Sequence, residues 1–361
     1  MKKIIASILI SSLYLSVFTA CNKSDDAPSY QISTGSLSIS LVDTSVIAGL
    51  VPLGNLNPPG HTFPTDHMYI YFKTPGAAVP VKAPGNLHIF QISRFRNNPG
   101  TVGETSDYRI DMGDPAGTVL YFSHLSSLSP LLETAAAGFS GASCEIYSTG
   151  GTNIEYCRKA VSLDVSAGNV IGAGNETISQ FAIDMGFTVN NIAVCPLDYF
   201  NATAKALLEL KLGNTTGTIR RTTTPLCGEI NHDVAGTLQG NWYKQGAPRS
   251  PEDAHIAFVK DNVEPAKLRI SIGSGVSGLA SDVYNFLPVT TGVVDRPFTS
   301  VTNNGQVFCY NPLYYYGAPV PNTSIIIKLE DNGNLSFEKR NCDCSCNQPY
   351  TFTAAKITYT K

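Results

Sequence analysis

Apolar residues recur at every second position in many short segments of this chain, a pattern typical of half-buried β-strands. The clearest alternation is Ser-Leu-Ser-Ile-Ser-Leu-Val within 35–43, and 68–72 is an apolar strand. Further strands are predicted at 79–84, 87–92, 107–112, 118–122, 180–187, 236–243, 255–259, 268–272, 324–329 and 335–338. The pattern therefore predicts a mostly β protein.

One segment has a convincing helical periodicity. Residues 199–212 carry an apolar stripe formed by Ala204, Leu207, Leu208 and Leu212. Residues 123–128 are expected to be briefly helical, and the glycine-punctuated segment 165–174 is expected to be a hairpin. Since the helix separates two β-rich halves, we predict a β-sandwich or barrel-sandwich-like domain at 35–212 and a second β-rich domain at 213–361.

The first twenty residues have the order of a secretory signal. Two lysines precede an apolar run at 4–17, which is shorter than the roughly 20 residues that span a bilayer. Small residues then lead to Cys21, which predicts a lipoprotein signal peptide at 1–20 and a lipid anchor on Cys21. The alternative is an ordinary signal followed by an accidental cysteine, and Phe18 stands where lipoprotein signals usually carry leucine.

The segment 21–34 is polar at its start and is expected to be a flexible tether. Its Lys-Ser-Asp-Asp run at 23–26 resembles the surface-export tag of Bacteroidetes lipoproteins, which implies display on the outside of the outer membrane. The expected location is therefore the outer membrane, with the chain lipid-anchored and surface-exposed. A net charge of −3 provides no basic field, so a nucleic-acid partner is not expected.

Removing Cys21 from the nine cysteines leaves eight, and an even number in an oxidising compartment indicates disulfides. Cys144 and Cys157 flank a glycine-containing turn, so a bridge across a hairpin is plausible, and Cys195 with Cys227 is a weaker candidate pair. Cys342, Cys344 and Cys346 would share one face of a strand. Disulfides are favoured there over a soft-metal site, because the two-residue spacing of zinc knuckles is missing.

Four of the six histidines lie in the first half: His61, His67, His88 and His124. Asp66 sits among them, and imidazole with carboxylate is a ligand set that zinc accepts. Zinc would lower the pKa of a bound water toward about 7. The alternatives are structural: His61 and Asp66 could bond the proline-rich loop 56–67, and His124 could cap a turn. His67 and His88 are expected to be packed or surface histidines.

The order of motifs over about residues 50–190 resembles the lysostaphin/LytM-type zinc endopeptidases (duplicated hybrid motif), which cut peptidoglycan cross-bridges. His61 and Asp66 match the first ligand pair of that family, and Val81-Lys82-Ala83-Pro84 matches the strand that follows. Phe122-Ser123-His124-Leu125 resembles the next motif, and 165–172 resembles its hairpin. The resemblance implies that His61 and Asp66 are metal ligands and that His124 is a proton donor or transition-state stabiliser.

The chain departs from the family at the last motif. Its His-x-His strand is replaced by Gln180-Phe181-Ala182-Ile183-Asp184, so the third ligand and the general base are absent as histidines. Asp184 could supply an oxygen ligand instead. His61 and Asp66 are also one residue further apart than in the family pattern, and residues 213–361 are not covered.

These features predict an outer-membrane-anchored lipoprotein whose peptidase-like domain is not catalytic. It would bind a cell-envelope glycan or peptide, or a partner protein. The alternative is an active zinc-dependent cell-wall hydrolase that uses His61, Asp66 and an unconventional third ligand. The second half offers the single tryptophan, Trp242, which is expected to anchor a sheet rather than mark a ligand face.

Overall fold

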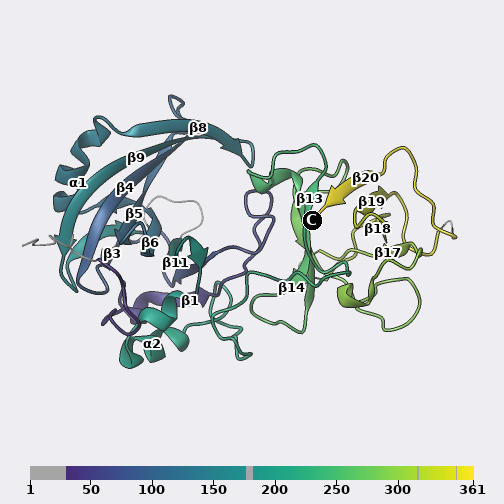
Figure 1. Cartoon of the computed structure of the whole chain (residues 1–361), viewed down its shortest axis with the longest axis horizontal. Coiled ribbons are helices and arrows are strands. Elements are labelled where there is room, and N and C mark those ends of the chain that lie inside the picture. The colour runs from purple at the N-terminus through teal and green to yellow at the C-terminus, as the bar shows by residue number, and fades with distance from the viewer. Residues whose placement is uncertain (1–29, 176–181, 315–316, 347) are drawn as a thin grey trace, which may run out of the picture.

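The computed structural model describes residues 30–175, 182–314, 317–346 and 348–361. The predicted signal peptide and Cys21 lie outside these residues, as does most of the tether. The protein is mostly β, as predicted, with a first domain and a second domain that both consist of antiparallel sheet (Figure 1). Neither α-helix in the described residues has the length and apolar character needed to cross a bilayer.

The first domain is built on a nine-stranded sheet with the order β1-β2-β11-β6-β5-β4-β9-β8, and β12 pairs with β11. A three-stranded sheet, β3-β10-β7, packs beside it. Its strands are β1 (Ile47–Val51), β2 (His67–Phe72), β3 (Val79–Lys82), β4 (Leu87–Asn97), β5 (Thr105–Gly113), β6 (Thr118–Leu125), β7 (Ser127–Leu128), β8 (Ser143–Thr149), β9 (Thr152–Val165), β10 (Val170–Gly174), β11 (Ala182–Val189) and β12 (Ile192–Ala193).

Two α-helices and three 3₁₀ turns complete this domain: α1 (Pro130–Ala136), α2 (Ala202–Glu209), η1 (Thr44–Val46), η2 (Ala137–Phe139) and η3 (Pro196–Tyr199). The helix predicted at 199–212 is shorter because Asn201 caps it, accepting a hydrogen bond from the Ala204 backbone N–H. Ala204 and Leu208 are buried in the first core. Helix α1, which begins with Pro130, was not predicted.

The second domain has one eight-stranded sheet with the order β16-β15-β14-β13-β20-β19-β18-β17. Its elements are β13 (Gly240–Lys244), β14 (Ile256–Lys260), β15 (Leu268–Ile272), β16 (Asp282–Tyr284), β17 (Phe308–Tyr310), β18 (Ser324–Leu329), β19 (Leu335–Arg340), β20 (Ile357–Thr360), η4 (Glu252–Ala254) and η5 (Phe298–Ser300). Two main apolar cores form, one from residues between Ile32 and Cys227 and one from residues between Leu238 and Tyr359. The boundary after residue 212 stays a prediction.

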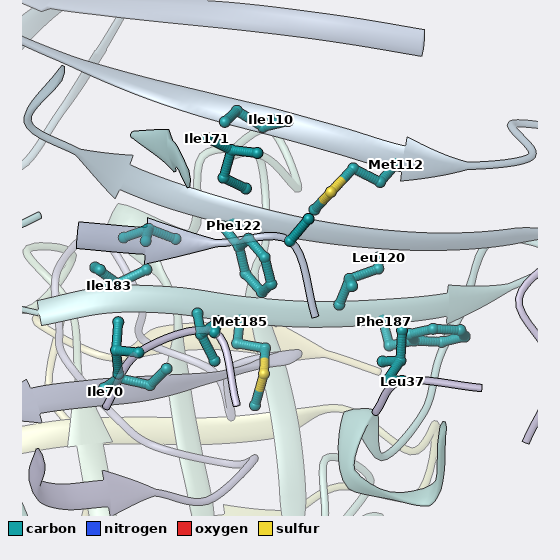
Figure 2. Packing of buried hydrophobic residues seen from close by; sticks show 14 of the residues in the cluster. Leu37, Ile70, Ile110, Met112, Leu120, Phe122, Ile171, Ile183, Met185 and Phe187 are labelled. Carbon is teal, nitrogen blue, oxygen red and sulfur yellow. The ribbon is translucent and has the colours of Figure 1, made fainter. Parts of the chain in front are cut away.

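The first core lies on one face of the nine-stranded sheet. Ile70 of β2, Ile183 and Met185 of β11, and Phe122 of β6 pack together there (Figure 2). Leu37 closes one end of the same cluster. The apolar positions of the central strands therefore point to this side, and their alternate positions are left for the opposite face.

Three local predictions were wrong. Segment 35–43 is not a strand: its buried leucines pack into the core while its backbone bonds Pro84 and Tyr199 instead of a ladder. Segment 123–128 is not helical, because β6 continues to Leu125 and β7 follows. Segment 165–174 is not a hairpin, because β9 pairs with β4 and β8 whereas β10 pairs with β3 and β7.

Candidate functional site

Five titratable residues form a continuous chain of ion pairs, which we call the carboxylate–imidazole chain: Asp66, His67, Asp184, His124 and Asp107. His67 Nδ1 lies 2.8 Å from Asp66 Oδ1, and its Nε2 lies 3.4 Å from Asp184 Oδ2. His124 Nε2 lies 3.3 Å from the same Asp184 oxygen, and its Nδ1 lies 3.3 Å from Asp107 Oδ2. Each nitrogen of both imidazoles thus faces a carboxylate.

The order of the strands in the sheet brings the residues of the carboxylate–imidazole chain together. β2, β11, β6 and β5 are consecutive neighbours in the sheet, although β2 and β11 are far in sequence from each other and from the β5–β6 pair. Side chains alternate between the faces of a strand, so Met68 and Ile70 enter the first core while His67 and Tyr69 face the other way. Asp184 lies opposite Tyr69 on one side and Ser123 on the other.

His124 reaches Asp184 because the backbone is distorted there. Its φ is 61°, in the left-handed region that non-glycine residues rarely adopt. The β5–β6 register shifts between Tyr108 and Ile110, which face Leu125 and Phe122. The bulge adds a residue to β6 and re-aims a side chain, as β-bulges commonly do. Such strain, held in place by the surrounding sheet, is often found at functional sites.

The carboxylates favour the protonated form of both imidazoles. Burial lowers the pKa of His124, but the charges of Asp184 and Asp107 outweigh it and raise the pKa to about 9. Burial likewise opposes protonation of His67, and Asp184 with Asp66 raises its pKa. His61 differs: burial, with His67 nearby, lowers its pKa to about 4, so it is neutral at pH 7.

The carboxylate–imidazole chain lies at the wall of a cavity of about 580 Å³ that both domains line. The first domain contributes His61, His67 and His124, with Phe95 and Tyr147 as aromatic walls. The second domain contributes the loop 250–252.

Two neighbouring carboxylates of the second domain hold two separate segments of the first domain near this cavity. Glu252 Oε2 accepts a hydrogen bond from the Phe63 backbone N–H, 2.8 Å away. Asp253 accepts from the Thr149 hydroxyl and from the Gly150 N–H, each at 2.6 Å. Burial raises the pKa of Glu252 to about 7. Phe63 also packs against Ala257 and Val259 of β14, so the contact between the domains is partly apolar.

The sequence-predicted residues His61, Asp66, Asp184 and His124 all come to this region. Their ring and carboxylate groups are not arranged around a common point, and no group of three or more His, Cys, Asp or Glu among the described residues is placed to hold a metal ion. His61 stacks edge-on against His67 with ring centroids 5.3 Å apart. Because the nitrogens of His67 and His124 face carboxylates, the donors as arranged do not match the open, three-ligand site of a catalytic zinc.

Sequence reasoning missed three residues of the site. His67 was expected to be packed or on the surface; it is buried, and it is also one of the two imidazoles of the carboxylate–imidazole chain. Asp107 and Glu252 were not singled out at all. A signal was present in β2, where histidine and tyrosines alternate with apolar residues, but nothing in the sequence joined it to Asp107 or to the second domain.

The remaining predicted residues are structural in the described part of the chain. Cys144 pairs with Cys157 and Cys195 with Cys227, as predicted. Cys342 and Cys346 pair with each other, and Cys344 pairs with Cys309 of β17; the three closely spaced cysteines lie in a turn rather than on one face of a strand. Trp242 is buried and its indole N–H donates to the Leu238 carbonyl, as expected for an anchor beneath a sheet.

The chain was compared with known proteins. No family model matches it. No curated protein matches it either. Among solved structures it is similar to the "Structure of the SpoIIQ-SpoIIIAH pore forming complex", at a TM-score of 0.29 and 12% identity, over 47% of this chain and 93% of that one. A likeness this distant supports no inference about function.

Proposed function

We propose that this chain is a cell-envelope lipoprotein that binds its ligand in the cavity between the two domains and does not hydrolyse it. Its ligand would be an envelope glycan or peptide, or a segment of a partner protein. The observation that carries the proposal is the carboxylate–imidazole chain, in which each nitrogen of His67 and His124 faces a carboxylate. Because these carboxylates raise the pKa of both histidines, the imidazoles favour the protonated form, which cannot accept a proton from an attacking water.

The cavity offers features that favour binding. Phe95 and Tyr147 supply apolar and aromatic surface, and Asn57 and Asn97 supply amide groups. Asp107 Oδ1 and Asp184 Oδ1 are buried and have no hydrogen-bond donor among the described residues. A buried acceptor without a donor costs about 1–3 kcal/mol, so a ligand that brings donors into this wall gains free energy.

Retention on purified cell-wall sacculi tests the binding proposal with the full chain. The unaltered protein is expected to be retained, and Glu252→Ala with Tyr147→Ala is expected to weaken retention, because both change the cavity wall. Asp164→Ala is the matched control: this exposed carboxylate also pairs with a histidine, His88, but does not line the cavity. Equal retention of all three proteins, or of none, contradicts a wall ligand in this cavity.

The second candidate is the zinc hydrolase, which is favoured by the convergence of His61, His67 and His124 on one cavity. Elemental analysis of the purified chain separates the two. One zinc per chain that is lost in His61→Ala and Asp66→Ala, with cleavage of sacculi, establishes the hydrolase. Zinc well below one per chain, with retention but no cleavage, supports the binding protein.

A further inference from the structure

Strand β8 is the outer edge of the nine-stranded sheet. It pairs with β9 on one side and with no described strand on the other (Figure 1). Six of its seven residues are exposed, including Ile146 at 70% and Tyr147 at 37%. The opposite edge of the sheet is covered: in β1, the N–H and C=O of Leu50 bond the backbone of Lys211 and Gly213.

Proteins usually protect exposed edge strands with proline, lysine, a bulge or a covering loop. The sequence of β8, Ser-Cys-Glu-Ile-Tyr-Ser-Thr, contains no proline or lysine. Its seven residue pairs with β9 run in unbroken register, so no bulge twists it away. The strand is also held rigidly, by the Cys144–Cys157 disulfide and by the bonds from Thr149 and Gly150 to Asp253.

The ladder indicates which backbone groups of β8 face outward. Cys144 lies opposite Cys157 with their Cα atoms 4.0 Å apart, the short spacing of a pair that does not exchange backbone hydrogen bonds. The N–H and C=O groups of Cys144, Ile146 and Ser148 therefore point away from β9. Three consecutive outward pairs can accept an added strand.

We propose that β8 pairs with β8 of a second copy of this chain, antiparallel and about a two-fold axis at Ile146. In this register Ile146 faces Ile146 of the second copy, and Cys144 faces Ser148, so all three outward residues are used. On the other face Glu145 lies opposite Tyr147. A self-paired strand is the isologous arrangement that two-fold dimers require.

Charge and register select this pairing over its neighbours. Sliding by one pair toward the N-terminus would place Glu145 directly opposite Glu145, and like charges directly opposite each other destabilise a strand pair. In the proposed register each Glu145 keeps Arg158 of its own chain, 3.3 Å away. The inference concerns assembly and goes beyond the proposed ligand-binding function.

Sedimentation of the full chain in detergent over a range of concentrations tests the proposal. A monomer–dimer equilibrium is expected, and Ile146→Lys should weaken it at least about tenfold, because it opposes two ammonium groups and removes an apolar pair. Val102→Lys is the control, since Val102 is fully exposed on another hairpin. A monomer at every concentration, or equal effects of both substitutions, overturns the pairing.

Cross-linking provides a second readout, which can trap even a weakly associated dimer. All eight cysteines in the described residues are in disulfides, so Ile146→Cys introduces a free thiol there. Opposed residues of an antiparallel pair have Cα atoms about 5.5 Å apart, within reach of a disulfide. Covalent dimer forming faster from Ile146→Cys than from Val102→Cys supports the register, and equal rates overturn it.

Discussion

Strands β2 and β14 each supply a central part of a core, but they use their two faces differently. Alternate residues of β2 are Met68 and Ile70 in the first core and His67 and Tyr69 on the opposite face. In β14 both faces are apolar: Ile256 and Phe258 enter the second core, and Ala257 and Val259 pack against Phe63 of the first domain.

This difference separates residues that stabilise the fold by packing from residues that carry titratable groups. The second domain gives both faces of its central strand to packing, one for its own core and one for its neighbour. The first domain packs one face of its sheet and gives the other to the carboxylate–imidazole chain. Substitutions in the two regions should therefore differ in size, in the domain that they affect and in their dependence on pH.

The largest effect is expected from Phe258→Ala, which empties a fully buried position of the second core. Such substitutions cost about 3–5 kcal/mol of unfolding free energy, since transfer and cavity terms add. Urea unfolding followed by the fluorescence of Trp242, the one tryptophan, measures this domain. Leu287→Ala, at a 73% exposed position, is the control. A loss below about 1 kcal/mol for Phe258→Ala would mean that the site repacks.

An intermediate effect is expected from Asp184→Asn, which removes the carboxylate shared by His67 and His124. The loss should be about 1–3 kcal/mol, because buried polar partners are left unpaired. Circular dichroism during urea unfolding should show it, while the Trp242 transition should stay in place. Asp164→Asn, which changes the exposed carboxylate that pairs with buried His88, should cost under about 1 kcal/mol. Equal losses of unfolding free energy for both substitutions would show that the carboxylate–imidazole chain adds no stability.

The third effect is a pH dependence centred on His124. Its pKa is raised from 6.5 to about 9, so its contribution to stability is fully present below pH 6.5 and is lost as the pH rises through 9. His124→Asn should flatten unfolding free energy against pH over this range, and asparagine tolerates the positive φ. His67, whose pKa is also raised, leaves a residual slope.

Unfolding free energies at several pH values between 6 and about 9.5 measure this effect. His232→Asn is the control, because burial lowers the pKa of His232 and this residue is not part of the carboxylate–imidazole chain. If unfolding free energy changes with pH equally steeply in His124→Asn and in the unaltered protein, His124 is not charged in the folded state.

The sequence predicted the β architecture and the Cys144–Cys157 disulfide because these depend on local patterns. Alternation located β2 and β6, and a glycine turn between Cys144 and Cys157 indicated their bridge. The segment 35–43 alternates equally well, yet it passes the end of the sheet, since periodicity reports burial and not hydrogen-bond partners.

The candidate site could be predicted in part. His61, Asp66, Asp184 and His124 were identified through a family resemblance; the structure places His61, Asp184 and His124 in the wall of one cavity and pairs Asp66 with His67 of the same wall. Their pairing depends on the order β2-β11-β6-β5, which no local pattern encodes. The bulge that turns His124 toward Asp184, and the arrival of Glu252 from the second domain, are products of tertiary packing.

Glu252 and Asp253 are adjacent in the chain, yet one holds the loop at Phe63 and the other holds the hairpin tip at Gly150. Adjacent residues of the second domain therefore tie together two segments of the first domain that are far apart in sequence. A shift of the second domain would act on both segments at once, so the position of the hairpin tip in the cavity wall depends on a domain that contributes only its loop 250–252 to that wall.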